Sequence, residues 1–120
     1  MSVYLNRVLL MGNLTRDPDL RTTKGGQSVC EFSLAINRLV KLHDGQEREE
    51  TCFVDLVIWG KQADACKKYL TKGRSVYVEG RLALDQWESE TGGRKSRLRV
   101  VAERISFIGG VRQNDGGSGQ

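Results

Sequence analysis

The sequence contains little of what catalysis or metal binding requires. Its 120 residues include one histidine, His43, and three cysteines that form no Cys-x-x-Cys pair. The histidine lies in a polar segment, no serine or cysteine is placed to be activated by it, and no His, Cys, Asp and Glu cluster has metal-ligand spacing. We therefore expect no enzymatic activity, no metal and no cofactor. An odd number of cysteines fits reduced thiols in the cytoplasm better than a disulfide framework.

Long apolar runs are also missing from the chain. No stretch approaches the roughly 20 residues of a membrane span, and the N-terminal segment reaches a charge at Arg7, unlike a secretory signal. The sequence thus predicts a cytoplasmic protein without membrane contact. A length of 120 residues allows one domain with one modest core.

No sign of charge dominates the sequence. The net charge is +4 and the isoelectric point is near 9.1. A mildly basic balance of this size permits a polyanionic partner such as nucleic acid, but it is weak evidence for one.

What the sequence does contain is a central strand pattern at residues 51–60 (TCFVDLVIWG). Alternation gives one apolar row, suited to a core, formed by Cys52, Val54, Leu56 and Ile58. The other row holds Phe53, Asp55, Val57 and Trp59. Two aromatic rings beside a charge suit either a wet surface that holds something planar or a second apolar face at an interface. This strand alone leaves both interpretations open.

The remaining patterns predict a small β protein. The expected strands cover residues 4–14, 28–37, 51–60, 75–84 and 96–107, with a short extended piece at 20–22 and one helix at 61–70. Gly80 predicts a bulge or bend, and residues 40–50 predict a long, flexible hairpin. Five strands with one helix between the third and fourth is the order of an OB-fold, a five-stranded Greek-key barrel. The fold class is therefore all-β.

A binding function has residues to support it. OB-folds that hold single-stranded nucleic acid combine a basic groove with aromatic rings, on which each stacked base contributes roughly 1–3 kcal/mol. The candidate rings are Phe53, Trp59 and Trp87. The candidate groove cations are Arg7, Arg21, Arg38, Lys41, Lys61, Lys72, Arg74, Arg94, Lys95, Arg97 and Arg99. Acidic residues at 47–50 and beside Trp87 argue against this interpretation, because they repel phosphate.

Several motifs resemble one known family. NRVLLMGNLTRDPDLR, SVCEFSLAINR, the WGKQA junction and KGRSVYVEGRL occur together and in order. The chain resembles the bacterial single-stranded DNA-binding protein family over roughly residues 3 to 109. The resemblance implies a homotetramer of OB-folds that wraps single-stranded DNA without sequence preference and without catalysis, in replication, recombination and repair.

The resemblance also implies roles for individual residues. The family's stacking aromatics fall at Phe53, Trp59 and Trp87. Its phosphate contacts fall at Lys61 and Lys72, and the further basic candidates are Arg7, Lys41 and Arg74. The first strand, from Leu5 through Leu9 to Met11, resembles the family's dimer edge, and Val54 and Tyr77 resemble its tetramer contacts.

Two positions depart from the family pattern. A fourth stacking aromatic would fall at Val40, which predicts one weaker stacking site per subunit. The family also carries several cations just before the last tryptophan, where this chain has Leu84, Asp85 and Gln86. This part of the DNA path should be less electropositive.

Residues 1–109 are expected to form the domain, and residues 110–120 to begin a disordered glycine-rich linker. Family members carry beyond such a linker an acidic tip that recruits replication and repair proteins, and this sequence does not include one. Three other functions remain open. They are a dimeric adaptor like the primosomal replication protein, a purely structural oligomer whose aromatics are interface core, and an RNA binder.

Overall fold

The computed structural model describes residues 2–109. Most of this part of the chain is β-strand, formed where apolar and polar residues alternate along the sequence. The elements are β1 (Val8–Leu14), β2 (Asp19–Thr22), β3 (Ser28–Lys41), β4 (Glu47–Trp59), α1 (Lys61–Tyr69), β5 (Ser75–Glu88) and β6 (Arg94–Ile108). No helix in this part of the chain is long and apolar enough to cross a bilayer. The expectation of a disordered linker at residues 110–120 lies outside the described residues.

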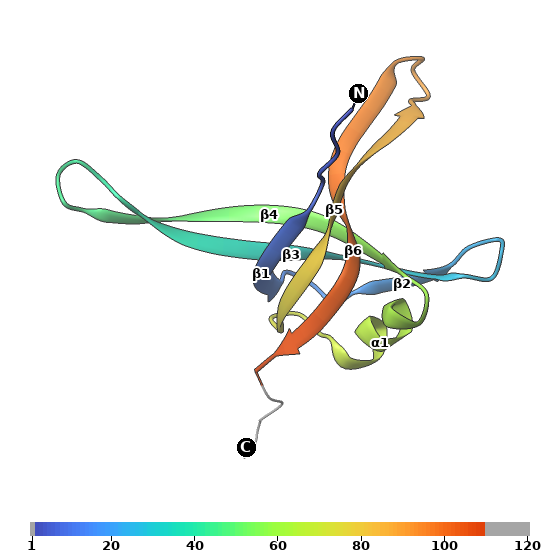
Figure 1. Ribbon diagram of the computed structural model, residues 1–120, viewed down its shortest axis with the longest axis horizontal. Coiled ribbons are helices and arrows are strands. Elements are labelled where there is room, and N and C mark those ends of the chain that lie inside the picture. The colour runs from blue at the N-terminus through green and yellow to red at the C-terminus, as the bar shows by residue number, and fades with distance from the viewer. Residues whose placement is uncertain (1, 110–120) are drawn as a thin grey trace.

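Five of these strands close into a barrel (Figure 1). The sheet order is β1-β5-β6-β4-β3-β2, and β1 also pairs with β3, which closes the ring. The predicted fold class is confirmed, because β1, β3, β4, β5 and β6 form the OB-type barrel and α1 follows its third strand. The short extended piece is β2, a strand outside the ring that pairs with the first residues of β3.

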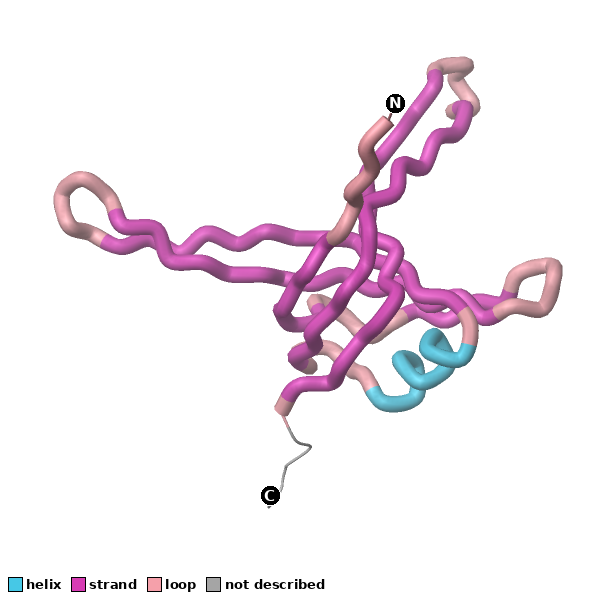
Figure 2. Tube along the Cα trace, viewed as in Figure 1, coloured by secondary structure: helices cyan, strands magenta, loops and turns pink. Residues whose placement is uncertain are grey.

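Two long hairpin arms project from the barrel in different directions (Figures 1 and 2). One arm continues β3 and β4, with paired residues as far as Lys41 opposite Glu47. The other continues β5 and β6, with Glu88 opposite Arg94. The hairpin predicted at residues 40–50 is present, with its turn confined to residues 42–46 and regular strand on either side. Charged side chains pair across this arm. In one such pair, Arg38 Nε lies 3.2 Å from a carboxylate oxygen of Glu50.

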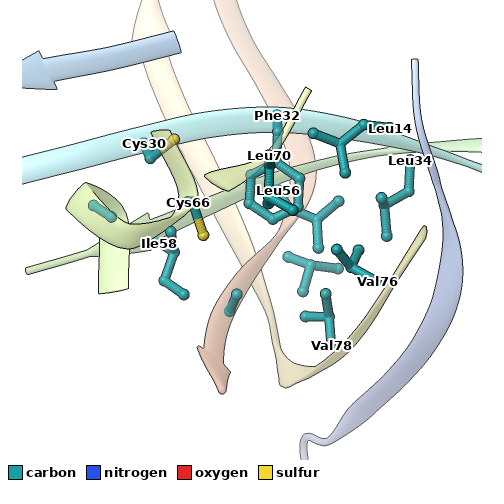
Figure 3. Close-up of a cluster of buried hydrophobic side chains, with 13 residues drawn as sticks. Leu14, Cys30, Phe32, Leu34, Leu56, Ile58, Cys66, Leu70, Val76 and Val78 are labelled. Atoms are coloured by element: carbon teal, nitrogen blue, oxygen red, sulfur yellow. The ribbon is translucent and has the colours of Figure 1, made fainter. Parts of the chain in front are cut away.

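The core fills the barrel and extends beneath α1 (Figure 3). Its largest fully buried side chains come from β3, β4, β5 and the residue after α1, and include Phe32, Leu34, Leu56, Ile58 and Leu70. Each such side chain contributes about 1.5–3 kcal/mol relative to full exposure. On β3 and β4 these residues are even-numbered, so the odd-numbered residues of both strands face away from the core.

The predicted core row of β4 is correct only inside the barrel. Leu56 and Ile58 are buried, but Cys52 is exposed, because β4 has already left the barrel at that residue. Leu82 continues the inward phase of Val76 and Val78 on β5, yet it is also exposed, on the β5–β6 arm. Val57, predicted in the outer row, is buried where β4 lies between β3 and β6.

A bulge at Gly80 separates the barrel part of β5 from its arm, as predicted. Glu79 pairs with Arg104 but Gly80 pairs with Ala102, so the register shifts by one residue on β6. A Cβ at position 80 would overlap the backbone carbonyl oxygen of Val101 and lie 3.0 Å from the Cα of Ala102. Only glycine allows the two strands to approach this closely without rearrangement.

The three cysteines should differ sharply in reactivity. Burial raises the pKa of Cys30 to about 11 and that of Cys66 to about 12, whereas Cys52 is exposed. Because the thiolate is the reactive form, we expect one thiol to react rapidly with Ellman's reagent at mildly alkaline pH, and all three to react after unfolding. Cys52→Ser should remove the rapid phase. Rapid reaction of two or more thiols in the folded protein would contradict this assignment.

Candidate nucleic-acid interface

The outward-facing residues of β3, β4, β5 and β6 form one continuous surface. On β3 and β4, Ser33 pairs with Asp55. On β5 and β6, Asp85 pairs with Arg97, and Trp87 follows Asp85 by two residues on β5. The parallel pairing of β4 with β6 joins the two halves. The three candidate stacking rings, Phe53, Trp59 and Trp87, therefore lie on one side of the barrel, because they share the outward phase of the strand alternation.

Three exposed aromatic rings lie on this surface. The exposed fractions are 70% for Phe53, 41% for Trp59 and 46% for Trp87. Phe53 lies where β4 leaves the barrel, Trp59 at the end of β4, and Trp87 near the end of β5 in its arm. Rings of this size normally contribute to stability through burial. Three that remain exposed on one surface are available to stack on planar groups.

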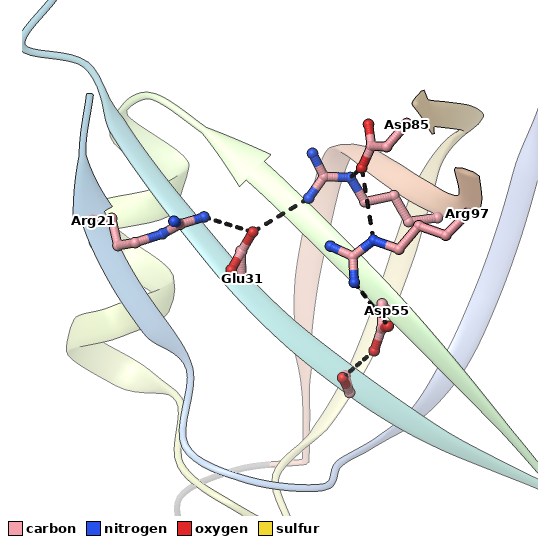
Figure 4. A network of polar contacts seen from close by, with 7 residues as sticks. Arg21, Glu31, Asp55, Asp85 and Arg97 are labelled. Atoms are coloured by element: carbon pink, nitrogen blue, oxygen red, sulfur yellow. Dashed lines mark hydrogen bonds and ion pairs between the residues drawn. The ribbon is translucent and has the colours of Figure 1, made fainter. Parts of the chain in front are cut away.

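Six charged residues between these rings form a continuous ion-pair network (Figure 4). It consists of Arg21, Glu31, Arg99, Asp85, Arg97 and Asp55. Glu31 Oε2 lies 2.7 Å from Arg21 Nη2 and 3.3 Å from Arg99 Nη1. Asp85 Oδ2 contacts the Nε atoms of both Arg97 and Arg99. At the other end, Arg97 lies 3.8 Å from Asp55, which accepts a hydrogen bond of 2.6 Å from the hydroxyl of Ser33.

The network touches the aromatic rings. Trp59 lines a shallow hollow together with Arg21, Glu31 and Arg99. A second hollow next to it is lined by Glu31, Arg97 and Arg99 and is bounded on β4 by Asp55. Three arginines and three carboxylates cancel in formal charge, so the network itself is neutral, and Arg16, which also lines the second hollow, is an additional cation beside it.

Sequence analysis identified the arginines of this network but not their partners. Arg21, Arg97 and Arg99 were groove candidates, and each is paired with at least one carboxylate. The acidic partners come from β3, β4 and β5, far apart in the chain. One signal could have revealed part of this pairing. Arg97 and Arg99 occupy alternate positions of one predicted strand, and Asp85 lies on the strand before it, so the two strands of a hairpin would bring them together.

The five predicted phosphate contacts are not brought together. Lys61 opens α1 two residues after Trp59 and is exposed, and Lys41 lies far out on the β3–β4 arm. Lys72 is exposed, with its backbone N–H donating to Asp17. Arg74 is half-buried, and Arg7 Nη2 lies 2.9 Å from Glu79. Their contact with phosphate stays a prediction, with Lys61 nearest in sequence to an exposed ring.

The residues predicted to form oligomer contacts lie on other parts of the fold. Leu5, Leu9 and Met11 are all more than half exposed. Tyr77 pairs with Met11 across β1 and β5, and its hydroxyl donates to Glu79, which raises the pKa of Tyr77. Val54 is half-buried and packs against the core. The β5–β6 arm adds exposed leucines that the sequence did not indicate, namely Leu82, Leu84 and Leu98.

Metal chemistry finds no support in residues 2–109. No group of three or more His, Cys, Asp and Glu side chains there is arranged to hold a metal ion. The buried cysteines, Cys30 and Cys66, belong to the core.

A closed five-stranded barrel with one helix after the third strand defines an OB-fold, and this one has an aromatic outer surface. The chain belongs, more particularly, to the single-strand binding protein family, whose model matches residues 5–108. The family resemblance seen in the sequence is thereby confirmed.

Individual relatives agree with this assignment. The single-stranded DNA-binding protein of Helicobacter hepaticus is 39% identical over 103 residues, which cover 86% of this chain and 61% of the relative. That of Staphylococcus aureus (strain MRSA252) is 41% identical over 111 residues, or 92% of this chain and 70% of the relative. The chain thus spans 61% and 70% of the length of these two proteins.

Two solved structures show the same fold. The Plasmodium falciparum SSB, solved in complex with single-stranded DNA, has a TM-score of 0.83 at 27% identity, with 91% of this chain and 99% of that chain covered. The wild-type single-stranded DNA-binding protein of Thermus aquaticus has a TM-score of 0.77 at 40% identity, with 88% of this chain and 51% of that chain covered.

Proposed function

We propose that this protein binds and protects single-stranded DNA, without sequence preference and without catalysis, during replication, recombination and repair. Bases stack on Phe53, Trp59 and Trp87, while basic side chains neutralise phosphates. Because every base has a π-face, such stacking tolerates any sequence. A protein with this role works where DNA is unwound, so we place it in the cytoplasm at the nucleoid.

The observation that supports this proposal most strongly is the set of three exposed rings on one outer surface of the barrel. The rings lie at the end of β4, at its exit from the barrel and in the β5–β6 arm. A single strand that crosses the barrel and follows the arm could meet all three in turn. Double-stranded DNA would not fit this arrangement, since its bases are already stacked on each other.

Tryptophan fluorescence during titration tests the proposal directly, because both tryptophans are among the three rings. We expect oligo-dT to quench the emission strongly, duplex DNA of the same length to leave it nearly unchanged, and raised salt to weaken the quenching. Unchanged emission with every nucleic acid would mean that the aromatic surface is an assembly surface. Equal quenching by an RNA oligomer would extend the binding to RNA.

We also propose that the protein is a homotetramer. Exposed apolar side chains on the N-terminal segment and β1, among them Leu5, Leu9 and Met11, lie beside a strand edge that needs a partner. Light scattering should give four times the chain mass of 13.4 kDa. A mass of two chains would favour the dimeric adaptor function instead, and a monomer would contradict both.

Lys61 is expected to contribute to the salt dependence of binding. Its ammonium group is exposed at the start of α1, close in sequence to Trp59. Loss of one phosphate contact on a single strand lowers the slope of log K against log salt by about 0.7. We expect this change for Lys61→Ala, measured from oligo-dT isotherms over a range of salt. Lys68→Ala, on the same helix, should leave the slope unchanged, and an unaltered slope for both variants would make Lys61 an ordinary surface residue.

A further inference from the structure

We infer that the ion-pair network limits how strongly this surface attracts DNA, and that Asp85 is the residue through which it does so. The inference rests on the proposed function. Three arginines face the path between the aromatic rings, but three carboxylates already hold them. A phosphate that approaches this surface must compete with those carboxylates.

Asp85 is placed to form ion pairs with two arginines at once. A single oxygen, Oδ2, contacts Nε of Arg97 at 3.9 Å and also Nε of Arg99. The Arg99 side chain is only 17% exposed and is held on its other side by Glu31. Arg97 is 49% exposed, so it is the cation of this pair that a phosphate can reach.

Asp85 also lies beside a stacking ring. It precedes Trp87 by two residues on β5, so both side chains point to the same side of the strand. A base stacked on Trp87 would bring its own phosphate close to the Asp85 carboxylate, within the roughly 8 Å over which charges interact at physiological salt. The carboxylate therefore weakens DNA binding in two ways. It repels the phosphate, and it pairs with Arg97 and Arg99, which would otherwise attract the phosphate.

Removing the charge of Asp85 should strengthen the attraction of DNA to this surface and leave the other ion pairs of the network in place. Asparagine has nearly the same shape and can still accept a hydrogen bond from a guanidinium group. Arg97 keeps Asp55, and Arg99 keeps Glu31, so neither arginine is left without a carboxylate. The network then carries a net charge of +1 beside Trp87 instead of zero.

The test compares Asp85→Asn with Asp64→Asn in oligo-dT titrations over a range of salt. Asp64 is exposed on α1, outside the network, and its substitution changes the net charge by the same amount. We expect Asp85→Asn to bind about two- to fivefold more tightly at low salt, as an exposed ion-pair interaction allows. Its salt dependence should be steeper by about 0.7 for one added phosphate contact. Asp64→Asn should match the wild type in both measurements.

Other outcomes would overturn the inference. Unchanged or weaker binding by a folded Asp85→Asn protein would mean that Asp85 holds Arg97 and Arg99 in place for DNA or is irrelevant to it. If this variant fails to fold, Asp55→Asn provides the second test, with an effect of the same direction expected at the other end of the network. Absence of oligo-dT binding by the wild type would instead contradict the proposed function itself.

Discussion

Replacing Trp59 by alanine is expected to weaken binding of oligo-dT by about 1–3 kcal/mol, the contribution of one stacked base. The indole is 41% exposed at the end of β4, and it borders a hollow lined by Arg21 and Arg99. A base laid on this ring would thus have a cationic side chain nearby. Anisotropy of a labelled oligo-dT, measured at one fixed salt concentration, gives the change in affinity.

Two control variants separate stacking from a change in structure. Trp59→Phe keeps an aromatic ring and should retain most of the affinity. Tyr69→Ala removes a ring that is 53% exposed, more than Trp59, and that lies on α1 near Phe107, away from the aromatic surface. It should leave binding unchanged. If Trp59→Ala binds as tightly as the wild type, Trp59 has no stacking role.

The barrel could be predicted from the sequence because its strands alternate cleanly where they are half-buried. Cys30, Phe32, Leu34 and Ile36 form an unbroken apolar row on β3, and the structure buries the first three and packs Ile36 against them. A period of two over such a length admits few other interpretations. The helix was predictable for a similar reason, since Ala63 and Cys66 fall on one side and are both buried.

A long hairpin was predicted at residues 40–50, but the length of the paired arms was not, because the sequence does not indicate where a strand leaves the core. Alternation continues through Cys52 and Leu82, so both resemble core positions, although both are exposed. The polar residues 40–50 give no apolar alternation that marks how far the strands stay paired. Their pairing depends on cross-strand partners such as Arg38 with Glu50, which contribute only in the folded sheet.

Only part of the candidate site could be predicted from the sequence, namely the aromatic residues and not the partners of the arginines. Residue type and strand phase place Phe53 and Trp59 in the outer row of β4, but this strand alone did not separate a stacking surface from an interface. The pairing of the arginines between these rings with carboxylates depends on strand register. Glu31 on β3 meets Arg21 on β2 and Arg99 on β6 only after four strands, β2, β3, β4 and β6, have paired. Counting cations along the chain therefore overstates how basic this surface is.

Replacing Gly80 by alanine is expected to destabilise the fold by about 1–3 kcal/mol, as overpacking of a well-packed site does. The added methyl group would overlap the carbonyl oxygen of Val101, which belongs to the paired backbone of β6 and cannot rotate away. β5 and β6 would have to separate at the bulge where the barrel ends and the arm begins. Thermal unfolding at one fixed protein concentration should show a Tm lower by several degrees.

Gly93→Ala is the matched control for this substitution. Gly93 lies at the tip of the β5–β6 arm, where the nearest atom to an added Cβ is the Ser89 hydroxyl at 3.7 Å, an ordinary contact. Its stability should stay within about 0.5 kcal/mol of the wild type. Equal Tm values for Gly80→Ala and the wild type would mean that the strands separate there at little cost. The bulge would then not fix the direction of the arm that carries Trp87, and the path proposed for DNA along that arm would lose its rigid support.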